Sequence, residues 1–143
     1  METTPRSKAR EITLQALFCM DMRQDTSPEM LDLYCENYTI SKKAFPFFLE
    51  LVKGIIPVIP EIDAFIERFS ANWKISRMSG VDRNAMRIAV YEMLYRKDIP
   101  IKVSINEAIN LGKKFGAEES GAFINGILDS VRIALEKKEK IAG

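Results

Sequence analysis

The sequence predicts an all-α fold of about seven helices, packed as one domain over residues 1–143. Apolar residues recur at helical spacing in most segments, and no segment rich in Val, Ile and Thr shows the alternation of a half-buried strand. The chain has 143 residues, of which 47% are hydrophobic and 29% charged. This composition is typical of a globular domain, and the length is sufficient for one hydrophobic core.

In the first half of the chain, prolines and short polar residues mark the predicted helix starts. Pro5 is tolerated in the first turn of the first helix, Ser27 is a predicted N-cap, and Ser41 opens the third helix. The predicted helices span about 5–22, 28–37, 41–56 and 61–73. The first helix carries a second apolar face at Leu14 and Phe18, which indicates either core packing on two sides or a covering partner.

The second half carries clearer start and stop signals. Ser79 followed by Asp82 resembles a capping box and opens a helix through about 96, with Ala85, Ile88, Ala89 and Met93 inward. The next helix lies within 101–115, where Gly112 suggests close backbone packing and Gly116 is a predicted left-handed C-cap. The last helix has one continuous apolar stripe at Ile124, Ile127, Leu128, Val131 and Leu135.

Charge is balanced overall but unevenly distributed. The formal net charge is +1, yet residues 21–67 hold nine acids and four bases, whereas residues 72–102 hold seven bases and three acids. Arg83, Arg87 and Tyr91, spaced by four, form a basic and aromatic stripe. Such a distribution allows a basic face for phosphates at neutral total charge, although solvated helix faces also produce it.

The sequence points away from catalysis. It has no histidine and no glycine-rich phosphate loop, and acid pairs such as Asp82 and Glu92 are more typical of helix starts than of a reaction centre. Cys19 and Cys35 are predicted to be reduced, buried thiols of a cytoplasmic protein. We expect no catalytic residue, no cofactor, no metal site and no membrane span, and therefore a binding protein.

Two surface features favour RNA as a ligand. Arg6, Lys8 and Arg10 lie at the entrance to the first helix, where they oppose the helix dipole and suit an arm that becomes ordered on phosphates. Phe123 and Asn125 lie beside the core stripe of the last helix, and an exposed Phe next to an amide suits base stacking. An ordinary soluble terminus and a buried Phe123 are the alternatives.

Four segments carry a family resemblance. They are SKAREITLQALF at 7–18, VDRNAMRIAVYEM at 81–93, IPIKVSINEAINLGKKFGAEES at 99–120 and FINGILDSV at 123–131. In this order and spacing the chain resembles the NusB family of bacterial transcription antitermination factors. The resemblance covers essentially the whole chain and is densest in residues 73–131.

The resemblance implies a non-catalytic, all-helical protein of two packed subdomains, with N-terminal helices over about 5–70 and C-terminal helices over about 78–138. It also implies partners: the ribosomal small-subunit protein NusE, the boxA element of nascent RNA, and other Nus factors and RNA polymerase through the complex. A homodimer is a further possibility that the family allows. The implied outcome is suppression of premature termination, notably in ribosomal RNA operons.

Carried over by position, the resemblance assigns residues to each surface. The expected RNA-binding residues are Arg6, Lys8, Arg10, Arg87, Lys102, Phe123 and Asn125. The expected NusE-facing residues are Leu14, Phe18 and Asp82, with Phe18 at a position that is often Tyr in the family. Two alternatives stay open: an RNA-binding module of a ribosomal RNA cytosine methyltransferase, and an adaptor that contacts only proteins.

Overall fold

A computed structural model describes residues 4–71 and 73–142, with side chains up to Lys138. Within these ranges the chain forms seven α-helices and two short 3-10 turns, and no residue lies in a strand. The predicted all-α fold is therefore confirmed. The helices are α1 (Pro5–Arg23), α2 (Pro28–Asn37), α3 (Phe45–Ile55), α4 (Ile59–Phe69), α5 (Gly80–Tyr95), α6 (Ile101–Phe115) and α7 (Ser120–Ala142), and the turns are η1 (Ile56–Val58) and η2 (Ile75–Arg77).

Side-chain caps set several helix starts, as the sequence predicts. The hydroxyl of Ser27 accepts a hydrogen bond from the Met30 amide at 3.2 Å, and that of Ser79 accepts one from the Asp82 amide at 3.1 Å. Each bond satisfies an amide that has no partner inside the helix. One carboxylate oxygen of Asp82 is buried without a hydrogen-bond partner among the described residues, so this oxygen does not make the reciprocal bond of a capping box.

One predicted helix start, one predicted helix end and one predicted cap conformation are wrong. The hydroxyl of Ser41 accepts from the Ala44 amide at 3.2 Å in a turn that precedes α3, so this helix starts at Phe45. The α4 helix ends at Phe69 rather than at residue 73. Gly116 follows α6 with φ −100° and ψ −163°, which is extended and not left-handed backbone. A Cβ at Gly116 would lie 2.5 Å from the Ser120 hydroxyl, so close packing explains this glycine.

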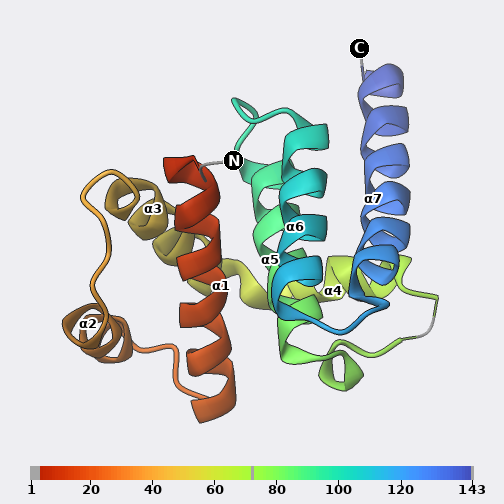
Figure 1. Cartoon of the computed structure of the whole chain (residues 1–143). Coiled ribbons are helices and arrows are strands. Elements are labelled where there is room, and N and C mark those ends of the chain that lie inside the picture. Colours follow the sequence, from red (N-terminus) through yellow and green to blue (C-terminus); the bar gives the residue numbers. More distant parts are fainter. Residues whose placement is uncertain (1–3, 72, 143) are drawn as a thin grey trace.

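The α5 helix is the central element of the fold (Figure 1), and it packs against α1, α3, α4, α6 and α7. Its predicted inward residues are all buried. The α6 and α7 helices pack closely at Gly112, where a Cβ would lie 2.6 Å from the Ile124 side chain. The close packing predicted for Gly112 is thus confirmed, and the apolar stripe of α7 is buried from Ile124 to Val131.

Both cysteines, Cys19 and Cys35, are free thiols, but they are half-buried rather than buried as predicted. In the parts of the chain that the structure describes, no helix is long and apolar enough to cross a membrane.

Candidate functional site

Two cations at the start of α1, Arg6 and Lys8, are exposed. The Arg6 guanidinium lies 4.6 Å from the centroid of the Phe47 ring, and the Lys8 ammonium lies 3.5 Å from the Glu11 carboxylate. Exposed contacts of these kinds are weak, so both charges remain available to a phosphate group. The sequence suggested a mobile arm here, but the described chain is already helical at Pro5.

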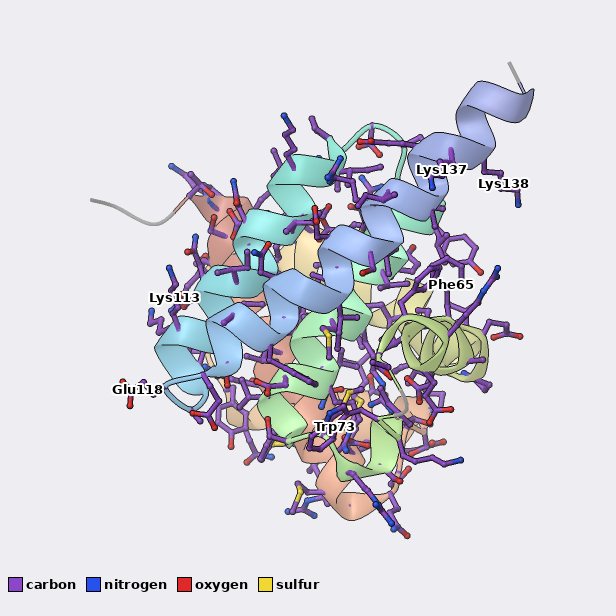
Figure 2. The ribbon with its side chains drawn as sticks, turned by 90° about the vertical axis from the view of Figure 1, so that its right-hand side faces the viewer. Phe65, Trp73, Lys113, Glu118, Lys137 and Lys138 are labelled. Carbon is purple, nitrogen blue, oxygen red and sulfur yellow. The ribbon has the colours of Figure 1, made fainter. Side chains whose placement is uncertain are left out.

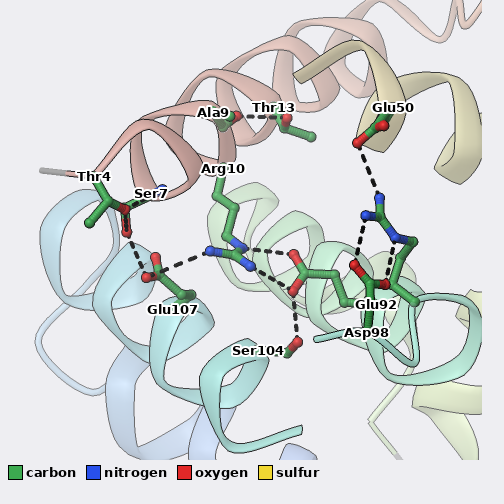
Figure 3. A network of polar contacts seen from close by, with 11 residues as sticks. Thr4, Ser7, Ala9, Arg10, Thr13, Glu50, Glu92, Asp98, Ser104 and Glu107 are labelled. Atoms are coloured by element: carbon green, nitrogen blue, oxygen red, sulfur yellow. Dashed lines mark hydrogen bonds and ion pairs between the residues drawn. The ribbon is translucent and has the colours of Figure 1, made fainter. Parts of the chain in front are cut away.

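Arg10, the third cation of this cluster, is buried. Its burial corrects the prediction of a cation that faces RNA. It is 2% exposed and donates two hydrogen bonds to the Glu92 carboxylate, at 2.7 and 3.0 Å (Figure 3). The Ser104 hydroxyl donates to the same carboxylate at 2.7 Å, and Glu107 lies 3.7 Å from the guanidinium. Arg10 therefore joins α1 to α5 and α6, and in this structure its charge is neutralised inside the protein.

Further contacts hold the first turns of α1 against α6. The Ser7 hydroxyl donates to the Glu107 carboxylate at 2.6 Å (Figure 3), and the Lys114 ammonium donates to the Glu11 carboxylate at 2.8 Å. The Thr4 hydroxyl accepts from the Ser7 amide at 3.1 Å and caps the helix. These contacts place Arg6 and Lys8 on a rigid helix end.

Arg87 is also buried, which corrects the prediction of an exposed basic stripe on α5. It donates to both oxygens of Asp63 on α4 at 2.7 Å and to the Asn84 side chain at 2.9 Å. Asp21 of α1 lies 3.5 Å from it and accepts from Arg83 at 2.7 Å. Burial alone would raise the pKa of Asp21, but the Arg83 hydrogen bond and the nearby Arg87 charge hold it below its usual value.

The other predicted RNA-binding residues fall into two separate groups. Lys102 is exposed at the start of α6, the end at which α1 also begins (Figure 1). Phe123 and Asn125 belong to the first turns of α7, which follow the opposite end of α6, roughly 20 Å away by helical rise. Phe123 is half-buried and Asn125 exposed, and residues two apart on a helix point in different directions.

An apolar hollow of about 320 Å³ lies between α1, α2, the start of α5 and the end of α6. Leu14 is 2% exposed and belongs to its buried side, whereas Phe18 is 37% exposed. Tyr34 and Tyr38 stack with ring centroids 4.4 Å apart, and burial raises the pKa of Tyr34 to about 12. The hollow is lined by Leu14, Gln15, Phe18, Cys19, Tyr34, Tyr38, Val81 and Phe115. We call this hollow the α1–α2 groove.

The start of α5 completes one edge of the α1–α2 groove. A Cβ on Gly80 would lie 2.5 Å from the Phe18 ring, so this ring packs directly on the backbone of Gly80. Val81 lines the groove, and the next residue, Asp82, has a buried carboxylate oxygen without a hydrogen-bond partner in the described chain. An unsatisfied buried acceptor is costly, but this oxygen is closed to solvent, so a donor from a partner reaches it only when the Asp82 side chain turns outward.

Comparison with known proteins identifies the family. The model of the NusB family matches residues 7–132. The chain belongs to the NusB family. It is 55% identical to the transcription antitermination protein NusB of Desulfatibacillum aliphaticivorans over 135 residues, which are 94% of each chain. This relative and a second one that is 51% identical, from Desulforapulum autotrophicum, are named for transcription antitermination and not for an enzymatic activity.

Solved NusB structures share the fold. T. maritima NusB superposes with a TM-score of 0.79 at 42% identity, covering 94% of both chains. A structure of the antitermination factors NusB and NusE in complex with dsRNA matches with a TM-score of 0.79 at 30% identity, covering 91% of this chain and 97% of that one.

Sequence reasoning on this NusB chain missed several surface residues. Tyr34, Tyr38 and Phe115 line the α1–α2 groove. The two tyrosines are four residues apart, and this spacing could have indicated that their rings share one face. Trp73 was assigned to a helix, but it follows α4 and lies 52% exposed against Phe123. A single large aromatic residue between two helices has no periodicity that reveals its exposure.

Proposed function

We propose that this member of the NusB family pairs with NusE and binds boxA RNA, and so suppresses premature transcription termination in the cytoplasm, notably in ribosomal RNA operons. One observation carries the proposal: exposed cations at the start of α1 and the apolar α1–α2 groove form two separate surfaces of one rigid body. Other Nus factors and RNA polymerase join through the complex. A solved relative with both NusE and dsRNA bound supports the assignment of two ligands.

On the RNA side, the proposed contacts are the residues of the predicted set that are exposed or half-buried. Arg6, Lys8 and Lys102 supply phosphate contacts at one end of α6, and Phe123 and Asn125 act at the other end. Arg10 and Arg87 support the surface from inside by joining helices, because carboxylates neutralise both.

On the NusE side, Phe18 is the proposed anchor. Its ring is partly exposed above the buried Leu14, and Asp82, whose carboxylate has an unpartnered oxygen, directly follows Val81 of the groove lining. A partner that inserts an apolar side chain and donates one hydrogen bond would satisfy both features.

Replacing Phe18 with Ala is expected to weaken NusE pairing at least about tenfold, because the ring is the partly exposed anchor, and to lower the thermal unfolding midpoint only modestly, because part of the ring packs on Gly80. Isothermal titration with the cognate NusE measures the first effect, and circular dichroism measures the second. Met22→Ala is the matched control, since Met22 is 67% exposed on the same helix and lies outside the groove lining. A large loss of thermal stability with unchanged pairing would make Phe18 a core residue instead.

The proposed function is tested by a mobility-shift assay with boxA RNA, with and without the cognate NusE, over a series of salt concentrations. We expect a complex that tightens when NusE is present and weakens steeply as salt rises, because released counterions drive phosphate binding. No shift at low salt with NusE present would reject RNA binding and leave an adaptor that contacts only proteins.

A further inference from the structure

Trp73, the single tryptophan of the chain, is labelled in Figure 2; it is half exposed, and its ring contacts that of Phe123. The indole is 52% exposed, its ring centroid is 5.9 Å from that of Phe123, and the two planes meet at 74°. Leaving half of such a large apolar ring in water forfeits much of the hydrophobic free energy that its burial would provide. The exposure of Trp73 is therefore a feature that packing of this chain does not explain.

The backbone of Trp73 is hydrogen-bonded to Ser70, the residue that follows α4. The buried Ser70 hydroxyl donates to the Trp73 carbonyl at 2.6 Å, and the Trp73 amide donates to the Ser70 carbonyl at 3.1 Å. Two residues further on, the Ile75 amide donates to the Glu67 carboxylate at 2.9 Å. A ring on a fixed backbone loses little entropy when a ligand binds, so this aromatic pair is preorganised.

The arrangement of the two rings suits a planar ligand. In an edge-to-face pair the edge of one ring covers a single face of the other, whereas stacked rings cover a face of each, so this geometry leaves more ring surface for a ligand. Lys74 and Arg77 are exposed close by in the sequence, and neither makes an ion pair with the rest of the described chain. Aromatic rings flanked by cations are typical of sites for single-stranded nucleic acid.

We propose that Trp73 and Phe123 together form a stacking site for one unpaired base of the bound RNA. This inference rests on the proposed RNA binding and adds a residue and a recognition mode to it. It also gives the first turns of α7, which carry Phe123, a role distinct from the phosphate contacts at Arg6 and Lys8. A protein ligand is less favoured here, because apolar side chains of a partner are better accommodated by a concave surface such as the α1–α2 groove.

Intrinsic fluorescence provides a direct test on the unmodified protein, because Trp73 is the only tryptophan. Titration of the full chain and cognate NusE with single-stranded boxA RNA is expected to quench the emission of this indole, with the midpoint seen in the mobility-shift assay. A parallel titration of NusE alone measures the emission of any tryptophan in NusE. After this emission is subtracted, the signal reports on Trp73. An unchanged emission at saturating RNA would overturn the stacking site.

Variants of Trp73 test how much the stacking site contributes to the affinity for RNA. Trp73→Ala is expected to lower RNA affinity about tenfold, the usual order for loss of one stacked base, whereas Trp73→Phe retains most of the affinity. Tyr95→Ala is the matched control, since Tyr95 is 49% exposed and its ring lies 5.4 Å from that of Tyr91 on α5. Circular dichroism checks that each variant is folded.

The outcomes separate the two proposals. If Trp73→Ala binds RNA like the unmodified protein while a charge reversal at Arg6 and Lys8 weakens binding, the stacking site is wrong and the proposed function stands. If Trp73→Ala weakens NusE pairing alone, the ring belongs to a protein interface and the stacking site is again wrong. If the unmodified protein with NusE binds no boxA RNA, both proposals fail.

Discussion

Replacing Arg10 with Met is expected to lower the free energy of unfolding by about 3–5 kcal/mol. The change leaves Glu92, which is 0% exposed, without the cation that neutralises it. The Ser104 hydroxyl remains as a donor, but a single neutral hydrogen bond does not replace a bidentate guanidinium. Urea denaturation followed by circular dichroism measures the loss, with the slope of the transition checked for two-state behaviour.

The Arg10 result distinguishes an internal clamp from an RNA contact. Arg132→Met is the matched control, because Arg132 pairs with Asp129 and Glu136 on the surface of α7, where water screens the charges, and we expect no measurable change. If Arg10→Met unfolds like the unmodified chain and instead loses RNA affinity, Arg10 faces RNA, as the position in the sequence suggested. Unchanged RNA affinity per folded molecule would support the clamp.

Reversing the charges of Arg6 and Lys8 together, as Arg6→Glu and Lys8→Glu, is expected to weaken boxA RNA binding at least about tenfold at low salt. Two phosphate contacts are lost, so the slope of log affinity against log salt should decrease by about 1.4, at roughly 0.7 per contact for a single strand. Stability and NusE pairing should persist, because both side chains are exposed and lie outside the lining of the α1–α2 groove. Filter binding over a salt series measures the effect.

A control with the same change in net charge isolates the effect of position. Lys137 and Lys138 are exposed on α7 near its C-terminal end (Figure 2), and their reversal to Glu should leave RNA affinity nearly unchanged. Equal losses in both double variants would show that total charge and not the start of α1 governs binding. No loss in either would remove Arg6 and Lys8 from the RNA surface.

Local signals predicted the elements well where a side chain acts on its own backbone. The start of α2 after Ser27 and that of α5 after Ser79 match the prediction, because a hydroxyl cap is set by residues within one turn. The end of α4 did not match, because a hydroxyl at Ser70 and a carboxylate at Glu67 hold the following segment in a non-helical path. Those bonds compete with helix continuation in a way that apolar periodicity does not show.

The candidate site was predicted in part. The position of Phe18 on a second apolar face of α1 led to the α1–α2 groove, since a helix apolar on two sides must be covered on both. The cations were harder to predict, because Arg6 and Arg10 are four residues apart on one face of α1 and both guanidinium groups lie over the Phe47 ring, so spacing does not show which of the two is buried. Arg6 is exposed, whereas Arg10 meets an acid that is far away in the sequence.

The sequence by itself determined the helical class, most helix starts, the apolar stripes and the NusB resemblance, because these depend on residue type and spacing along one segment. Only the tertiary structure decided which cations remain available to a ligand. Glu92 captures Arg10 and Asp63 captures Arg87 only after the helices have packed. A buried charge needs a partner, and the partner here comes from another helix, so no single segment of the sequence reveals the pairing.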